Sequence, residues 1–126
     1  MPSLTVGGTF HFNDRPGNNH RYVIVSSLAA PEVVIVNMTT LKPWKDRSCI
    51  IKAGEHPFAE HDTCISYRHA EVVPTTVLQR KEQFGDIAVK EPMSAALLDR
   101  IWDGAASTQF LSLRCLQILK TQGLIP

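Results

Sequence analysis

The chain has 126 residues, 44% of them hydrophobic and 20% charged, and a formal net charge of +1 at pH 7. This composition indicates one globular domain and excludes a disordered or collagen-like chain. The charge excludes nucleic-acid binding through bulk positive charge, but it does not exclude a local basic site. No apolar run is long enough to span a bilayer, and the first residues do not resemble a secretory signal. The three cysteines include no CxxC pair, which is typical of reduced thiols, so we expect a cytoplasmic protein.

The chain up to residue 74 predicts short strands separated by turn-forming residues. The expected strands cover residues 10–12, 20–26, 32–38, 47–51, 63–67 and 70–73. The second and third are rich in β-branched residues with little polar alternation, so we expect both of their faces to be buried. A turn over 13–19 separates the first two strands. Five or six strands at such close spacing predict a small antiparallel barrel.

The rest of the chain is mostly helical. One helix is predicted over 93–103, with Gly104 as its stop, and a second over 112–122, with Leu113, Cys115, Leu116 and Leu119 facing inward. Residues 77–84 could form a short helix, and 85–89 a turn and an edge strand. We therefore expect one α+β domain over 1–126, mostly β-barrel over 1–74 and mostly helical over 75–126.

The densest polar cluster of the sequence lies at residues 54–64, with two histidines, three carboxylates and a thiol. His56, His61 and Cys64 are candidate metal ligands, but zinc ligands usually come as two pairs, and no second pair is evident. A solvated loop whose histidines cap turns is the simpler interpretation of either histidine alone. A third interpretation is acid–base catalysis, for which imidazole is suited near neutral pH.

Two further polar clusters stand at the ends of the strands expected to be buried. His20 and Arg21 enter the first of these strands directly from the turn, and arginine can hold a phosphate through two parallel hydrogen bonds. The other strand runs out into Thr39 and Thr40, followed by Lys42. Taken singly, each cluster has an ordinary explanation, as a polar strand start or as a threonine pair with high β-propensity.

Three aromatic residues could present a flat surface to a base. For Trp44 and Tyr67 we expect burial instead, because a small barrel needs an aromatic core. Phe58, within the polar cluster, is either a loop anchor or a stacking ring, and the sequence does not decide between the two.

In this order and spacing, the motifs resemble the MazF/PemK-like toxin family, small SH3-like barrels that act as sequence-selective endoribonucleases. Gly7-Gly8-Thr9-Phe10 stands where the family begins its first strand after a Gly-Asp step, although the Asp is missing here. The segment from His20 to Ser27 looks like the family's Arg-Pro-apolar-apolar-Val-Leu-Ser segment, with Tyr22 in the place of proline. Val36-Asn37-Met38-Thr39-Thr40 looks like its strand ending in a threonine pair. The resemblance covers about residues 7–73.

The resemblance implies cleavage of single-stranded RNA without metal or cofactor, by a homodimer that a cognate antitoxin inhibits. It implies that Arg21 and Thr39 are catalytic, and we expect their side chains to meet on one face of the barrel. Because arginine is a poor proton carrier, we expect an acid or base among His20, His56 and His61. The expected substrate-binding groups are Arg15, Thr40, Lys42, Lys45 and Arg47.

Two alternatives remain open at this stage. The chain could be a non-catalytic SH3-like barrel that binds protein or nucleic acid, in which case the same polar residues are contacts at its rim. It could also be a degenerate member of the family, folded like the toxins but inactive because Tyr22 replaces proline and the Gly-Asp step is lost.

Overall fold

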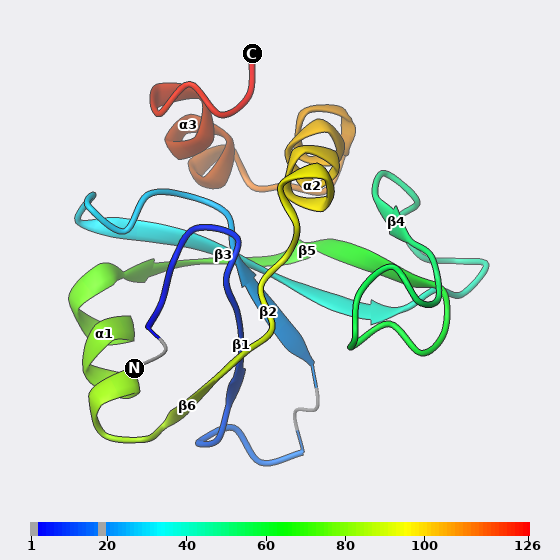
Figure 1. Ribbon diagram of the computed structural model, residues 1–126. Helices are drawn as coiled ribbons and strands as arrows, with labels where there is room; N and C mark the ends of the chain where they lie inside the picture. The colour runs from blue at the N-terminus through cyan, green and yellow to red at the C-terminus, as the bar shows by residue number, and fades with distance from the viewer. Residues whose placement is uncertain (1–2, 18–19) are drawn as a thin grey trace.

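Six strands form one antiparallel sheet, and three helices pack against it, so the predicted α+β class is confirmed (Figure 1). The computed structural model describes residues 3–17 and 20–126. The predicted turn over 13–19 is therefore described only to Gly17. The elements in chain order are β1 (Thr9–Phe12), β2 (Arg21–Ile24), β3 (Glu32–Thr40), β4 (Ile50–Ile51), β5 (Thr63–Pro74), α1 (Thr75–Gln83), β6 (Ile87–Lys90), α2 (Ala95–Ser107) and α3 (Leu113–Thr121).

The sheet is open, with the strand order β4-β5-β3-β2-β1-β6. Within the described residues no pairing joins β4 to β6, so the sheet is not closed into a barrel and the expected SH3-like barrel is not confirmed. The positions of the three helices explain why the sheet need not close. Figure 1 shows α2 and α3 on one side of the sheet and α1 on the other. Strands that are apolar on both faces are thus covered without closure.

Each face of the sheet has its own core. The first core lies under α2 and α3 and includes Val23, Val36, Met38, Ile65, Tyr67, Ile101 and Leu119. The second core lies toward α1 and includes Phe10, Phe12, Tyr22, Ile24, Ile35 and Leu78. Neighbouring residues of β2 and β3 alternate between the two cores, as side chains of a strand must. The prediction that these two strands are buried on both faces is confirmed.

Several local predictions differ from the structure. The strands expected at 63–67 and 70–73 are one strand, β5, whose pairing with β3 shifts register between Ile35 and Asn37. The side chain of Trp44, expected in the core, is 77% exposed, and Leu113 of α3 is 70% exposed. No helix of the described chain is long and apolar enough to cross a membrane.

Gly104 was expected to end α2, but it lies inside the helix. A Cβ at this position would lie 2.8 Å from the Ser48 carbonyl oxygen and closer still to Tyr67 Oη. The Tyr67 hydroxyl donates a hydrogen bond to the carbonyl oxygen of Ile101 at 2.6 Å. The glycine therefore serves the close approach of α2 to β5 and to the segment that precedes β4.

Burial raises the pKa of the Cys49 thiol from 9.0 to about 11. Above pH 9 the unfolded chain ionises this thiol while the folded chain keeps it neutral, so stability falls as pH rises from 9 to 11. We expect Cys49 to contribute about 2–3 kcal/mol to that fall. Urea unfolding at pH 8, 9, 10 and 11 measures it, with Cys49→Ala as the comparison. An equally steep fall in the variant would contradict this assignment.

Candidate active site

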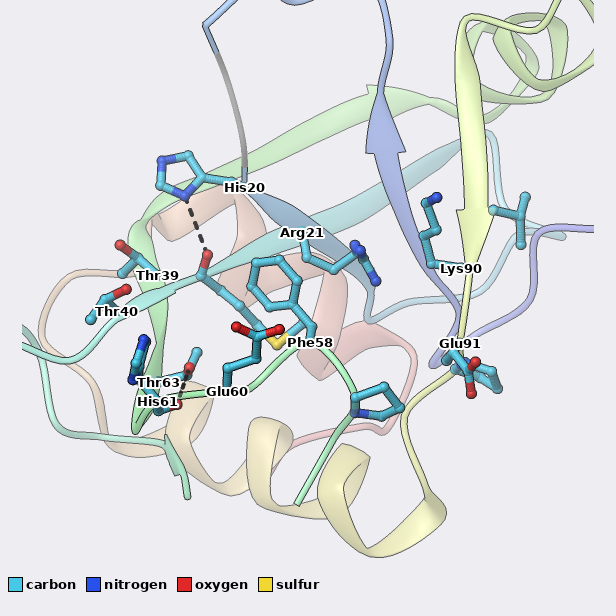
Figure 2. A pocket seen from close by; sticks show the side chains of 14 residues that line it. His20, Arg21, Thr39, Thr40, Phe58, Glu60, His61, Thr63, Lys90 and Glu91 are labelled. Atoms are coloured by element: carbon cyan, nitrogen blue, oxygen red, sulfur yellow. Dashed lines mark hydrogen bonds between the residues drawn. The ribbon is translucent and has the colours of Figure 1, made fainter. Parts of the chain in front are cut away.

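A cavity of about 970 Å³ opens where β2 begins and β3 ends. Its walls come from these two strands, the loop between β4 and β5, and the connection from β6 to α2 (Figure 2). Five of the predicted site residues line it: His20, Arg21, Thr39, Thr40 and His61. These segments are distant in sequence, so only tertiary structure brings them together.

Arg21 is the half-buried cation of this cavity. Its guanidinium lies 4.7 Å from the ring centroid of Phe58, a cation–π contact, and this partly buried ring also packs against the first core. Burial lowers the pKa of Arg21, while the nearby Glu91 carboxylate raises it. An arginine starting from a pKa above 12 stays charged under both influences. In Figure 2 its side chain points toward Lys90, a second cation on the wall.

Arg21 and Thr39 both line the cavity, but from opposite faces of the sheet. The strand register pairs Arg21 with Met38, so these two side chains share the face of the first core. Thr39 follows Met38 and therefore points to the other face, and Thr40 returns to the face of Arg21. Because the described pairing between β2 and β3 ends with Arg21 and Met38, Thr39 lies at an edge where both faces can be reached. The expectation that the two catalytic candidates meet on one face is not met.

The polar cluster at 54–64 is a structured loop in which only part of the charge is available. Arg100 holds the Glu55 carboxylate with two hydrogen bonds, of 2.7 and 3.2 Å, and lowers its pKa. Asp62 accepts a backbone N–H of the same loop at 2.9 Å. Glu60 and His61, in contrast, are exposed and line the cavity. The loop thus presents one carboxylate and one imidazole to the space beside Arg21.

His56, predicted as a catalytic candidate, has a structural role instead. Its side chain is only 4% exposed. Nδ1 accepts a hydrogen bond from the Phe58 N–H at 3.1 Å, so Nε2 carries the proton and donates it to the carbonyl oxygen of Glu91 at 2.9 Å. The same carbonyl accepts the Thr9 hydroxyl at 2.6 Å. His56 therefore ties the polar loop to the end of β6, and it positions Phe58 and Glu91 at the cavity.

We expect His56→Ala to lower the free energy of unfolding by about 1–3 kcal/mol, because the Phe58 N–H loses its acceptor and the Glu91 carbonyl oxygen loses one of its two donors. His61→Ala is the matched control. This histidine lies in the same loop but is exposed, so its loss should change stability by no more than about 0.5 kcal/mol. Urea unfolding of both variants measures the difference. Equal stability of the two variants would contradict the proposed structural role of His56.

The predicted basic patch is dispersed. Arg15 is held by Glu71 through two hydrogen bonds, of 2.8 and 3.0 Å, and covers the Phe12 ring at 3.7 Å, so it belongs to the second core's edge. Lys42 and Arg47 are exposed and outside the cavity wall, and Lys45 lines a second cavity described below. The cation that the sequence did not reveal is Lys90. Its position in the cavity wall depends on the pairing of β6 with β1, and no local pattern in the sequence predicts that pairing.

The remaining candidates are His20 and the proposed metal ligands. His20 is exposed at the rim, with Nδ1 3.3 Å from the carbonyl oxygen of Met38. Cys64 is buried, and burial raises its pKa. His56, His61 and Cys64 do not converge, and residues 3–17 and 20–126 contain no group of three His, Cys, Asp or Glu side chains that could hold a metal ion.

A scan against protein-family models, a search of curated proteins and a search of solved structures each found no match. The fold class and the geometry of the cavity are therefore the basis for any functional assignment. What they define is an α+β protein with an open cavity that combines an arginine, a lysine, an exposed glutamate, an exposed histidine and hydroxyl groups.

Proposed function

We propose that the protein is a toxin-type endoribonuclease that cleaves single-stranded RNA without a metal ion and is inhibited by a cognate antitoxin. The observation that carries the proposal is the convergence of Arg21 with Glu60 and His61 on one open cavity. The resemblance of the sequence motifs to the MazF/PemK-like family supports it as well. Under this proposal the open sheet is a variant of the family's SH3-like barrel.

The chemistry requires few groups. In RNA cleavage without metal, the 2′-OH attacks the adjacent phosphate, so a base must take the hydroxyl proton and an acid must protonate the leaving 5′ oxygen. Donors must also stabilise the charge that grows on the phosphoryl oxygens. We assign the donors to Arg21 and Thr40, and the acid–base pair to Glu60 and His61. Thr39 and His20 would contact the substrate from the rim.

The acid–base assignment separates this proposal from the non-catalytic alternative. Glu60→Gln and His61→Ala should each slow cleavage by about 10²–10⁴-fold, the usual contribution of general acid–base catalysis. Both residues are exposed, so the melting temperature should stay unchanged. If the protein only binds RNA, the same variants would change affinity and no reaction would be present to lose.

The direct experiment incubates the purified chain with a mixed-sequence RNA, with and without EDTA, and with DNA of the same sequence. We expect RNA cleavage that EDTA does not inhibit, products with 2′,3′-cyclic phosphate and 5′-hydroxyl ends, and intact DNA, because DNA lacks the nucleophile. Cleavage blocked by EDTA would contradict the proposed mechanism. Intact RNA that is bound tightly would favour the binding module, and intact unbound RNA the degenerate toxin.

The expected partners follow from the same proposal. They are an RNA substrate, an antitoxin protein and a second copy of the chain, in the cytoplasm. Sedimentation equilibrium tests the homodimer: a particle of twice 14.0 kDa is expected. A monomer that still cleaves RNA would remove the dimer from the proposal without touching the active site.

A further inference from the structure

A second cavity, of about 440 Å³, lies on the face of the sheet opposite to Arg21. Its walls come from β2, β3, β5 and the loop after β3, and they include Asn37, Lys45 and Glu71. Thr39, at the edge between the two faces, lines both this cavity and the larger one. A single-stranded RNA bound beside Arg21 could therefore continue around this edge into the second cavity.

Asn37 is the unusual residue of this cavity. Its side chain is only 5% exposed, and Oδ1 has no hydrogen-bond partner among the described residues. Buried polar atoms are rarely left unsatisfied, and each instance requires an explanation. A hydrogen-bond donor of a ligand would supply the missing partner.

Three polar side chains of this wall, Ser66, His69 and Glu71, already have partners. Ser66 Oγ lies 2.7 Å from His69 Nδ1, and both Glu71 oxygens accept hydrogen bonds from Arg15. The walls are thus held in place, and Asn37 Oδ1 remains as the unsatisfied acceptor. Lys45, on the same wall, adds a positive charge that suits a phosphate next to the bound group.

We propose that this cavity binds one nucleobase of the RNA, a base that carries an exocyclic amino group: adenine, cytosine or guanine. The proposal rests on the proposed function, since it assigns the cavity to a nucleotide near the one cleaved beside Arg21. Asn37 Oδ1 is itself buried, so the carboxamide must turn it toward the cavity before an amino group, which projects from the ring, can reach it. Uracil has only a ring N–H, flanked by two carbonyl oxygens that would approach Oδ1 and the Glu71 carboxylate unfavourably.

A third cavity supports the proposed path of the bound RNA. It shares Thr39 and Lys45 with the second cavity and is lined also by Trp44, Arg68 and Phe110. Trp44 is 77% exposed, and the Arg68 guanidinium lies 4.3 Å from the Phe110 ring centroid. Exposed rings beside cations form the stacking surfaces on which proteins hold single-stranded nucleic acids.

The test measures binding of the four nucleoside monophosphates by NMR titration, without RNA cleavage. We expect AMP, CMP or GMP to shift the amide signals around residues 37, 45 and 66, and UMP to bind about tenfold more weakly, the difference that one hydrogen bond makes. Asn37→Ala should abolish this preference. Lys45→Ala, at a less buried position, should weaken all monophosphates alike, with the exposed Lys120→Ala as its charge-matched control.

A second measurement uses a pool of RNAs with randomised sequence and identifies the cleaved members. The wild-type chain should disfavour uracil at one position, and Asn37→Ala should accept all four bases there. Different outcomes would contradict the base-binding cavity and the endoribonuclease activity. RNA cleavage whose base preference is the same in Asn37→Ala overturns the pocket alone. Monophosphate binding that depends on Asn37, with no RNA cleavage, overturns the endoribonuclease alone. Equal binding of UMP and CMP also overturns the pocket.

Discussion

Replacing Arg21 with alanine is expected to slow RNA cleavage by about 10²–10³-fold, the usual cost of removing one donor that stabilises the transition state. The guanidinium is the half-buried cation of the cavity of about 970 Å³, where burial strengthens its attraction to a phosphate. Arg21→Lys should restore little of the rate, because an ammonium cannot make two parallel hydrogen bonds to a phosphate. Single-turnover cleavage of a short RNA measures both variants.

Stability and net charge are controlled separately in this experiment. Loss of the contact between Arg21 and Phe58 should cost only about 0.5–1 kcal/mol, so the variant remains folded. Arg80→Ala is the charge-matched control, because this arginine is exposed on α1 and lies outside the cavity. Its rate should equal that of the wild type. Equal losses in the two variants would mean that bulk charge, and not the position of Arg21, supports the reaction.

Gly104→Ala is expected to destabilise the protein by about 1–3 kcal/mol, the usual cost of overpacking. Helix propensity alone predicts the opposite sign, since alanine in a helix interior is favoured over glycine by about 0.8–1 kcal/mol. The packing should prevail because the new Cβ would lie 2.8 Å from the Ser48 carbonyl oxygen and closer still to Tyr67 Oη. Neither backbone nor a buried tyrosine moves without disturbing the first core.

Urea unfolding of three variants isolates the cause. Ala106→Gly, at an exposed position of the same helix, should cost only about 1 kcal/mol through propensity. Tyr67→Phe removes the closest atom, so Gly104→Ala should cost less in that background than in the wild type. A stabilised Gly104→Ala would show that α2 can move away from β5.

Features that depend on interactions between near neighbours in the sequence could be predicted, and features that depend on tertiary contacts could not. Ser94 and Ser112 cap α2 and α3 by accepting the N–H of the third residue that follows each, and these helices were found from their apolar periodicity. The predicted loop at 54–64 does contribute to the candidate site. Within it, however, only tertiary contacts separate the paired Glu55 and the buried His56 from Glu60 and His61.

The sequence by itself determined the α+β class, the strands of β-branched residues and the positions of the helices, because propensity, capping and burial pattern act over a few residues. The tertiary structure decided that the sheet stays open, that Lys90 and not Arg15 joins Arg21, and that Thr39 faces away from it. These features depend on strand pairs such as Thr9 with Lys90 and Arg21 with Met38. A register shift of one residue would reverse the face of every side chain, and only the packing of distant segments selects the register.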